Sequence, residues 1–417
     1  MAWSFTGKKN RNALVAVLSV CAAGLAPHPA EQQRPSVRLQ LAALKGPFIG
    51  GSIVPLGDSF ASGSLFAVVG PGIIDGDRFI APTNVREPLT TAIVAANVGV
   101  SVSQNITIVP TPAPKAPLLA VAGYYGGLGL HRLDSLKLFG TTPIPGAAGD
   151  VASGPDGSLY VPATTTHTLW RARRNPWNIA ARGNVPLGNE VRVARQTGTV
   201  FVTNRDVDGW GGLTQLRGDT VRRIRTGRTA EGLAIDERHN RVYVGNVNDA
   251  TVLEVDATTL APLRRIRAVA RTFGIALHTR RRLLYVVSNQ TSNGGPKQGF
   301  AAAIDLSRPG APIIAKTEKL PFPLGVDVDE RTNRLFVTDE NANAVYVFDA
   351  LTLQRRGAAL RACGVPWRPH VDALRRRLYV PCALADKLAV FNLDTLLPVR
   401  GSPFETVRYP LGVDITP

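Results

Sequence analysis

The sequence predicts an all-β fold, a seven-bladed β-propeller closed by pairing of its N- and C-terminal strands and preceded by a small β-sandwich. The first observation is a triplet of an apolar residue, an aromatic residue and Val that recurs six times, about forty residues apart. Such a period indicates repeated units, which bury their apolar faces only against one another. The second is that residues 411–415 repeat the start of a unit and residues 118–121 repeat its continuation. A last unit split between the two ends of the chain would close a ring.

The aromatic residues of the triplet define the period. Their successive spacings are 41, 42, 42, 51 and 43 residues, so one unit carries an insertion. Stepping back 41 residues from the first of them reaches Leu119, which places the N-terminal fragment in phase with the other units. The six aromatic residues are Tyr160, Phe201, Tyr243, Tyr285, Phe336 and Tyr379.

Each unit contains four short runs in which apolar and polar residues alternate. In one unit, Leu233 and Ile235 alternate ahead of the triplet 242–244, and further runs follow at 251–256 and 263–266. Alternation with a period of two, bounded by Asp, Asn, Gly and Pro, indicates strands of an antiparallel meander. Four-stranded sheets of this kind, stacked radially, form a β-propeller.

Three of the units carry a more specific signature. Residues 201–204 read Phe-Val-Thr-Asn, residues 243–246 read Tyr-Val-Gly-Asn, and residues 336–339 read Phe-Val-Thr-Asp. These segments resemble the YVTN β-propeller repeat family, over roughly residues 117 to 417. The chain departs from the family pattern at Pro162 and Pro381, where Pro replaces Thr. The resemblance implies an exported bacterial or archaeal protein whose fold is related to that of seven-bladed lactonases and lyases.

Residues 1–30 have the pattern of a signal peptide. Lys8, Lys9 and Arg11 precede an apolar stretch at 13–20, and small residues follow up to residue 30. The stretch is too short for a transmembrane helix and no later segment is a candidate, so we expect no membrane span. We expect the protein to be exported to the periplasm or the extracellular space. Anchoring as a lipoprotein through Cys21 is less favoured, because Val rather than a small residue precedes that Cys.

The region between the signal peptide and the repeats has a different texture. Residues 31–112 contain strand-like runs separated by Gly and Pro, which predicts a small β-sandwich. These runs resemble immunoglobulin-like modules of the IPT/TIG type, and the alternative is an extended arm packed on the propeller. Residues 113–117 end a Pro-rich stretch that indicates a stiff linker. The propeller is then expected over residues 118–417.

The chain carries a large excess of positive charge, with 48 Lys and Arg against 31 Asp and Glu and a net charge of +17. Two arginine runs, 280–282 and 375–377, occupy equivalent turns between the first and second strands of their units. They indicate either a basic face for an anionic polymer or membrane surface or turns that are simply solvated. Nucleic acid is not an expected partner, because no recognition motif is present and the charge is scattered around the ring.

The opposite rim is where we expect a ligand site. Loops that lead into the first strands and loops between second and third strands open on this side. Arginines from four units could converge on a carboxylate or phosphate, with aromatic neighbours for a sugar or apolar ring. The alternative is that these side chains pack neighbouring units. The candidate ligand-binding residues are Tyr124, Tyr125, Asn204, Arg228, Glu231, Arg271, Asn289, Trp367, Arg368, His370, Arg408 and Tyr409.

Catalytic and metal signatures are sparse. The sequence has no nucleophile elbow, no zinc-protease motif and no phosphate-binding loop. Among the dispersed histidines, only His370 is expected near the channel mouth, where it could act as an acid or base. No cofactor is predicted, although oxygen atoms from several units could together hold a divalent cation. That set would be Glu190, Glu231, Asn204, Asn246 and Asn289.

Two cysteines follow the leader, Cys363 and Cys382, and both fall at the same rim on adjacent strands. Export to an oxidising compartment allows a disulfide between them. Closing a loop of this length would stabilise the fold by roughly 3 kcal/mol. The alternative is a pair of buried free thiols.

Two classes of function follow from these patterns. The first, which we favour, is a non-enzymatic binding or scaffold protein of the bacterial envelope that recognises an anionic or sugar-like ligand or a protein partner. The alternative is a lactonase-like or lyase-like enzyme with its site at the channel mouth. A closed ring exposes few sheet edges, so we expect a monomer.

Overall fold

The structure is a computed structural model that describes residues 44, 46–56, 64–82, 85–97, 100–110, 117–174, 177–207, 209–289 and 298–417. The expected signal peptide and residues 113–116 of the expected linker lie outside the described residues. Within the described part, the regular elements are strands, apart from a single 3₁₀ turn η3 (Ala383–Ala385). The all-β prediction is confirmed. No helix in this part of the chain is long and apolar enough to cross a membrane.

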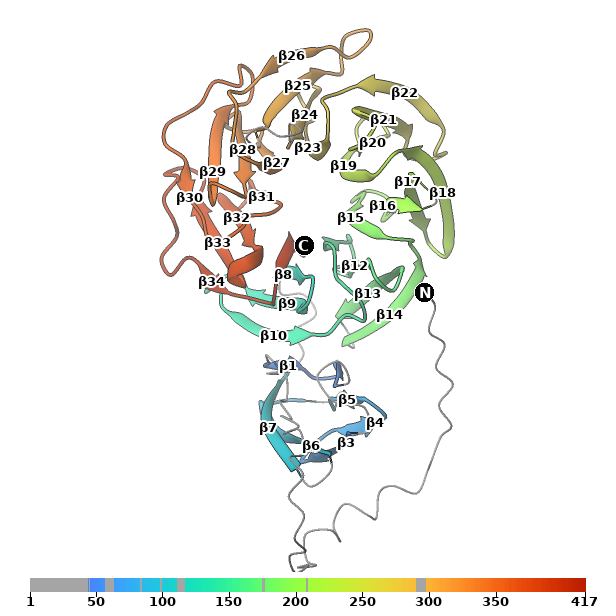
Figure 1. Cartoon of the computed structure of the whole chain (residues 1–417), viewed down its shortest axis with the longest axis vertical. Helices are drawn as coiled ribbons and strands as arrows, with labels where there is room; N and C mark the ends of the chain where they lie inside the picture. Colours follow the sequence, from blue (N-terminus) through green and yellow to red (C-terminus); the bar gives the residue numbers. More distant parts are fainter. Residues whose placement is uncertain are drawn as a thin grey trace, which may run out of the picture. The chain divides into compact units, whose positions relative to one another are not determined.

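Six four-stranded antiparallel sheets follow one another along the chain, each with its strands in sequence order. Figure 1 shows them side by side, with the first strand of each sheet innermost. This repeated arrangement is consistent with a β-propeller. The first three sheets consist of β11 (Ala152–Ser153), β12 (Leu159–Ala163), β13 (Thr168–Arg174) and β14 (Trp177–Asn184); β15 (Gly188–Val193), β16 (Val200–Val207), β17 (Trp210–Arg217) and β18 (Thr220–Gly227); and β19 (Ala230–Asp236), β20 (Arg241–Asn246), β21 (Thr251–Asp256) and β22 (Pro262–Arg267).

The next three sheets repeat the pattern with shorter outer strands. They consist of β23 (Thr272–His278), β24 (Leu283–Ser288), β25 (Phe300–Asp305) and β26 (Ile313–Lys316); β27 (Pro323–Asp329), β28 (Arg334–Asp339), β29 (Ala344–Asp349) and β30 (Leu360–Arg361); and β31 (His370–Asp372), β32 (Arg377–Cys382), β33 (Lys387–Asn392) and β34 (Phe404–Glu405).

The two ends of the repeat region pair with each other. The C-terminal strand β35 (Pro410–Ile415) runs antiparallel to β8 (Leu118–Gly123), which continues into β9 (Gly127–Arg132) and β10 (Leu138–Thr142). The register pairs Asp414 with Ala120 and Ile415 with Leu119. The expected phase is therefore one residue off, because Ala120 rather than Leu119 takes the position of the triplet aromatic.

The described residues between 48 and 109 contribute strands to two sheets and enclose an apolar core, which includes Phe79, Ile93 and Ile108. The short strand β1 pairs in parallel with both β7 and β10, so one eight-stranded sheet runs in the order β3-β6-β7-β1-β10-β9-β8-β35. The strands of this region are β1 (Phe48–Ile49), β2 (Ile53–Pro55), β3 (Leu65–Val69), β4 (Ile73–Asp75), β5 (Arg78–Ile80), β6 (Leu89–Asn97) and β7 (Val100–Val109).

Apolar clusters lie between neighbouring repeat sheets. The triplet aromatics are central to them, and Tyr243, Tyr285 and Phe336 are fully buried. The cluster at the end of the chain joins Tyr379 of β32 to Val121 of β8 and to residues of β35. Each sheet thus buries its apolar faces on its neighbours, which is why the triplet recurs.

The predicted disulfide is confirmed. Cys363 and Cys382 are bonded, with their Cα atoms 5.5 Å apart. The bond ties the segment before β31 to the end of β32, beside the isolated bridge between Pro366 and Cys382.

Candidate functional site

One position on each first strand faces a common central cavity. It is the residue that pairs with the triplet aromatic of the second strand, or with Ala120 in the split sheet. All seven such residues line a cavity of about 340 Å³. Three are alanines, which leave the cavity open, and four bear ionisable groups. In chain order they are Ala152, Arg192, Ala234, Ala276, Asp327, His370 and Asp414.

A second ring position lies two residues earlier in each unit. Four sheets have glycine there because the next sheet packs against the backbone: a Cβ on Gly232 would lie 2.5 Å from the carbonyl oxygen of Phe273, and one on Gly325 would lie 2.6 Å from that of Trp367. The other three sheets place charged side chains at this position, namely Asp150, Glu190 and Arg368. The charges of the channel are thus concentrated on one part of its wall.

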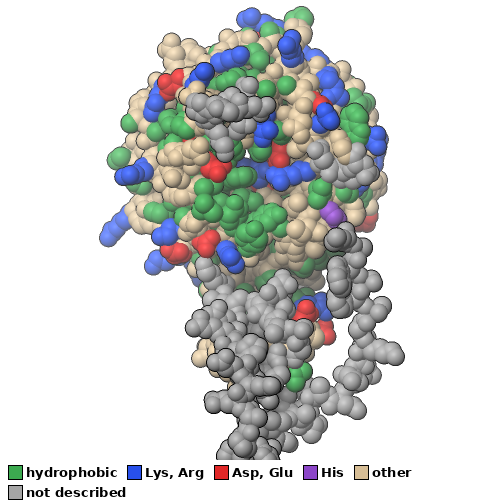
Figure 2. Space-filling model, viewed as in Figure 1, with side chains coloured by type: hydrophobic (Ala, Val, Ile, Leu, Met, Phe, Trp, Pro, Cys, Tyr) green, Lys and Arg blue, Asp and Glu red, His purple; other side chains and the backbone are tan. Residues whose placement is uncertain are grey.

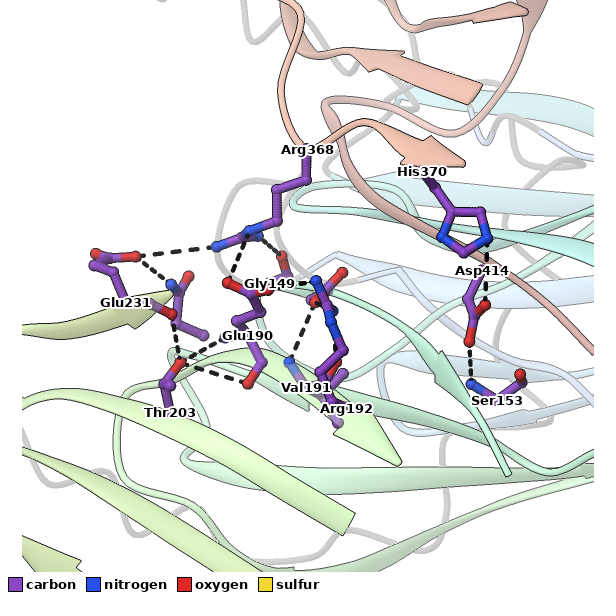
Figure 3. A network of polar contacts seen from close by, with 12 residues as sticks. Gly149, Ser153, Glu190, Val191, Arg192, Thr203, Glu231, Arg368, His370 and Asp414 are labelled. Atoms are coloured by element: carbon purple, nitrogen blue, oxygen red, sulfur yellow. Dashed lines mark hydrogen bonds and ion pairs between the residues drawn. The ribbon is translucent and has the colours of Figure 1, made fainter. Parts of the chain in front are cut away.

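These charged side chains form a continuous network (Figure 3). Arg192 donates from Nη1 to Oδ2 of Asp150 at 2.9 Å, and its other terminal nitrogen donates to Glu190. Arg368 reaches the same carboxylate, with Nε 3.6 Å from Oε2 of Glu190, and donates from Nη1 to the carbonyl oxygen of Gly149 at 3.0 Å. Glu190 is therefore held between two guanidinium groups.

Glu231, from the next sheet, extends the network. Its carboxylate accepts from Asn189 and pairs with Arg205, and it lies 4.0 Å from Nη2 of Arg368. Thr203 fixes the two sheets to each other, because its hydroxyl accepts from the backbone N–H of Glu190 at 3.1 Å and donates to the carbonyl oxygen of Glu231 at 3.0 Å.

Burial changes the proton affinity of the network. It raises the pKa of Glu190 to about 7, although Arg192 and Arg368 favour the ionised carboxylate. Burial also works against the charge of Arg192, but Glu190 and Asp150 outweigh it and raise the pKa of Arg192 above its usual range. Across the cavity, burial raises the pKa of Asp327, opposed by nearby His370 and by the backbone N–H of Val371.

A second cluster on the cavity wall has unused hydrogen-bonding capacity. His370 lies with Nε2 3.8 Å from Oδ1 of Asp414, and within the described residues its ring makes no hydrogen bond. Asp414 accepts from the backbone N–H groups of Ser153 and Ile415, at 2.6 and 2.8 Å. Arg195 is 60% exposed and lies 4.0 Å from Asp414. His370 and Arg195 therefore present donors to the cavity, whereas the carboxylate oxygens are already occupied.

The predicted rim residues fall into separate groups. Tyr124, Tyr125 and Tyr409 form an aromatic cluster, with ring centroids 4.9 to 6.2 Å apart. The guanidinium of Arg408 lies over the ring of Tyr125 at 5.3 Å. Tyr125 is 63% exposed, so this cluster belongs to the surface rather than to the cavity.

The remaining candidates serve different contacts. Arg271 donates to Asn289 at 3.2 Å, and Arg228 is exposed. Asn204 is buried, donating to the carbonyl oxygen of Pro186 and accepting from Thr214, so its amide holds loops together. Of the four predicted arginines, only Arg368 joins the channel network, beside Glu231 and His370. Trp367 lines a small cavity next to it.

The described residues contain no group of three or more His, Cys, Asp or Glu side chains arranged to hold a metal ion. In the oxygen set suggested by the sequence, Glu190 and Glu231 are paired with arginines. Asn246 donates to Thr251, and Asn204 and Asn289 make the contacts given above.

Arg195, which lines the cavity, was not predicted from the sequence. Neither were four residues at the two ring positions, Asp150, Arg192, Asp327 and Asp414. The sequence does contain a signal for these four residues, but it lies in their position within the repeat unit and not in a motif. They occupy places where the aligned units otherwise have Gly or Ala, so alignment of the units column by column would have exposed them. Figure 2 shows acidic and basic side chains meeting at the centre of this face.

No known family profile matches the chain, and no curated protein matches it. Solved structures do. A functionally unknown protein from Desulfotomaculum acetoxidans aligns with a TM-score of 0.58 at 13% identity, over 72% of this chain and 98% of that one. A protein from Lactobacillus plantarum aligns with a TM-score of 0.56 at 12% identity, over 72% and 99%.

A third structure has a functional description. It is a "putative 6-phosphogluconolactonase" from Bacteroides uniformis, with a TM-score of 0.57 at 11% identity, covering 72% of this chain and all of that one. At this level of identity the likeness concerns the fold alone, and the chain shares its fold with these propeller-like proteins.

Proposed function

We propose that the chain is an exported binding protein, a closed seven-bladed propeller of the YVTN type that holds a small oxygen-rich ligand in its central channel. The pairing of β35 with β8 and the apolar cluster around Tyr379 support closure. The bonds of Thr203 and of Thr338, which each join one sheet to the next, support the YVTN assignment, because both residues occupy the Thr position of that signature. The signal-peptide pattern of residues 1–30 and the disulfide support export.

The proposed class of ligand follows from the hydrogen-bond donors that line the cavity. His370 and Arg195 present donors without hydrogen-bonded acceptors in the described residues, and Arg368 contacts its carboxylates only at 3.6 and 4.0 Å. A ligand rich in acceptor oxygens, such as a sugar acid, complements these groups, since guanidinium groups bind carboxylates well. The cavity of about 340 Å³ is within the size range of small-molecule sites.

Isothermal titration calorimetry tests this assignment with D-gluconate and D-glucuronate as anionic probes and D-glucose as the neutral one. We expect the sugar acids to bind more tightly than glucose. Arg195→Ala and His370→Ala should each weaken the binding about tenfold or more, because a hydrogen bond to a charged group contributes about 1.5–3 kcal/mol. Arg281→Ala, an exposed arginine outside the cavity, is the matched control and should bind as the wild type does. If the wild type and the three variants bind the sugar acids equally tightly, the channel is not the binding site.

A second function is favoured by one observation, the pKa of about 7 that burial gives Glu190, whose partner Arg368 lines the same cavity as His370. Such groups suit the hydrolysis of a sugar lactone. A water oxygen would bond to the carbonyl carbon while His370 takes its proton, and the ring C–O bond would break with a proton returned to the leaving oxygen.

Hydrolysis of D-glucono-δ-lactone at pH 7, followed by acid release, tests this alternative. If the wild type hydrolyses the lactone well above the spontaneous rate, and His370→Ala does not, the protein is an enzyme. A rate equal to the background would leave the binding function.

A further inference from the structure

Two neighbouring outer strands carry the same unusual sequence. Residues 221–225 of β18 read Val-Arg-Arg-Ile-Arg, and residues 263–267 of β22 read Leu-Arg-Arg-Ile-Arg, at equivalent positions of their units. In β22 the isoleucine, Ile266, is buried in the cluster between sheets. The repeated pattern thus anchors each strand by one apolar side chain and leaves most of its arginines exposed, whereas Arg264 of β22 is half-buried and donates to Glu254 at 2.8 Å.

Both strands are the last of their sheets, so their outer edges face solvent (Figure 1). Arg225, Arg265 and Arg267 are exposed, and none of them forms an ion pair with a carboxylate in the part of the chain that the structure describes. Arg222 and Arg223 donate to the backbone carbonyl oxygens of Thr259 and Asn184, so their charges also lack a carboxylate partner.

The arginine runs that stand out in the sequence behave differently. Arg280 lies 3.2 Å from Glu330, Arg375 lies 3.2 Å from Asp372, and Arg376 lies 2.8 Å from Asp329. Carboxylates of the same or neighbouring turns therefore pair with three of the six arginines of those runs. The arginines of β18 and β22 that lack a carboxylate partner instead lie on the last strands of two consecutive sheets.

Apolar side chains are interleaved with these arginines. Val221 is 41% exposed and Leu263 is 47% exposed. Trp210, at the start of β17, is 47% exposed, with the guanidinium of Arg225 5.7 Å from its ring. Side chains of this mixture suit the headgroup region of a bilayer, where Trp is enriched and arginines neutralise anionic lipids. A soluble polyanion would use the charges and leave the apolar groups in water.

We propose that a basic outer surface, which consists of the arginines of β18 and β22 without a carboxylate partner together with Trp210, Val221 and Leu263, docks the protein on a bilayer of anionic lipids. The arginines are Arg222, Arg223, Arg225, Arg265 and Arg267. The inference is independent of the channel ligand. It assigns the outside of the second and third sheets to membrane contact and leaves the central cavity accessible.

Co-sedimentation of the purified protein with phosphatidylglycerol/phosphatidylethanolamine vesicles tests this proposal, with phosphatidylcholine vesicles for comparison. The triple variant Arg225→Gln, Arg265→Gln, Arg267→Gln should bind the anionic vesicles roughly 100-fold more weakly, since each basic residue near such a surface contributes about fivefold in affinity. Binding should also fall as ionic strength rises, and Trp210→Ser should weaken it at every salt concentration.

The matched control removes three exposed arginines that are each paired with a carboxylate: Arg280→Gln, Arg308→Gln, Arg331→Gln. The two triple variants have the same net charge and begin at the same residue, so neither property can account for a difference between them. The control should bind the vesicles as the wild type does. An equal loss in both triple variants would overturn the proposal in favour of net charge alone. Unchanged binding by the test variant, or equal binding to phosphatidylcholine, would also overturn it. If heparin displaces the protein from the vesicles, and Trp210→Ser binds heparin as tightly as the wild type does, the surface is a site for a soluble polyanion and the membrane proposal is wrong.

Discussion

At the scale of single residues, the threonine of the repeat signature has a defined task. Thr338 accepts from the backbone N–H of Gly325 at 2.9 Å and donates to the carbonyl oxygen of Trp367 at 2.6 Å. Thr203 makes the equivalent pair of bonds between its own sheet and the next. The signature is therefore a device that joins sheets, and its presence says more about the fold than about the ligand.

Replacing Thr338 by Val should lower the free energy of unfolding by about 1–3 kcal/mol, because two buried backbone groups lose their partner. Urea denaturation measures the change. Thr220→Val, on an exposed strand position, is the control and should change stability little. If both variants unfold at the same urea concentration as the wild type, the hydroxyl does not join the sheets.

His131 gives the fold a pH dependence. Burial lowers the pKa of this residue to about 4, although its bond to the carbonyl oxygen of Leu136 opposes the shift. Its other ring nitrogen lies 2.8 Å from the hydroxyl of Thr406. Since the unfolded chain takes up the proton near pH 6.5, the neutral buried ring contributes stability above that pH, and this contribution is lost as the pH falls toward 4.

The free energy of unfolding of His131→Gln, measured beside that of the wild type from pH 7.5 to 4, checks this. The advantage of the wild type over the variant should shrink by roughly 3 kcal/mol as the pH falls. Glu190 titrates in the opposite sense across part of the range, because its raised pKa favours the folded state at low pH. The difference between the two proteins, and not either curve alone, therefore reports His131. Parallel curves would contradict the assignment.

The channel contains both residues that the sequence predicted and residues that it did not. His370, Arg368 and Glu231 were predicted because their types stand out in rim loops. Asp150 and Arg192 were not, because each is an ordinary polar residue until its unit is aligned with the others. The contacts of Arg228, Arg271 and Arg408 depend on side-chain directions, which no spacing rule provides.

At the scale of elements, strand periodicity predicted most of the repeat sheets, because apolar alternation follows directly from burial on one face. The outer strands β30 and β34 have only two residues each, and the β1–β10 pairing joins Phe48 to Thr141, 93 residues apart in sequence. Neither feature has a periodic signal. The insertion of the longest unit falls largely at residues 290–297, outside the described residues.

The disulfide makes a prediction at this scale. Reduction of the Cys363–Cys382 bond, which closes a loop with a sequence separation of 19, should lower the free energy of unfolding by roughly 3 kcal/mol. Guanidinium denaturation with and without reductant measures this. The Cys363→Ala, Cys382→Ala double variant is the control, because its stability should not respond to reductant. Alkylation of both thiols in the native, unreduced protein would contradict the bond.

At the scale of the whole molecule, the site depends on the ends of the chain meeting. Asp414 reaches the cavity from the C-terminal strand, and a Cβ on the adjacent Gly412 would lie 2.0 Å from the carboxylate of Asp150. The wall of charged residues therefore spans the junction between the last and first sheets. Loss of the pairing between β35 and β8 would therefore disturb the contact of Gly412 with Asp150 and the place of Asp414 in this wall.

A crystal structure of the protein soaked with D-gluconate tests the central claim most directly. We expect the ligand inside the channel, with its carboxylate oxygens within hydrogen-bond distance of His370 or Arg195 and its hydroxyls toward Arg368. Density for gluconate at the tyrosine cluster of the rim, with an empty channel in a protein that binds gluconate in solution, would contradict the account.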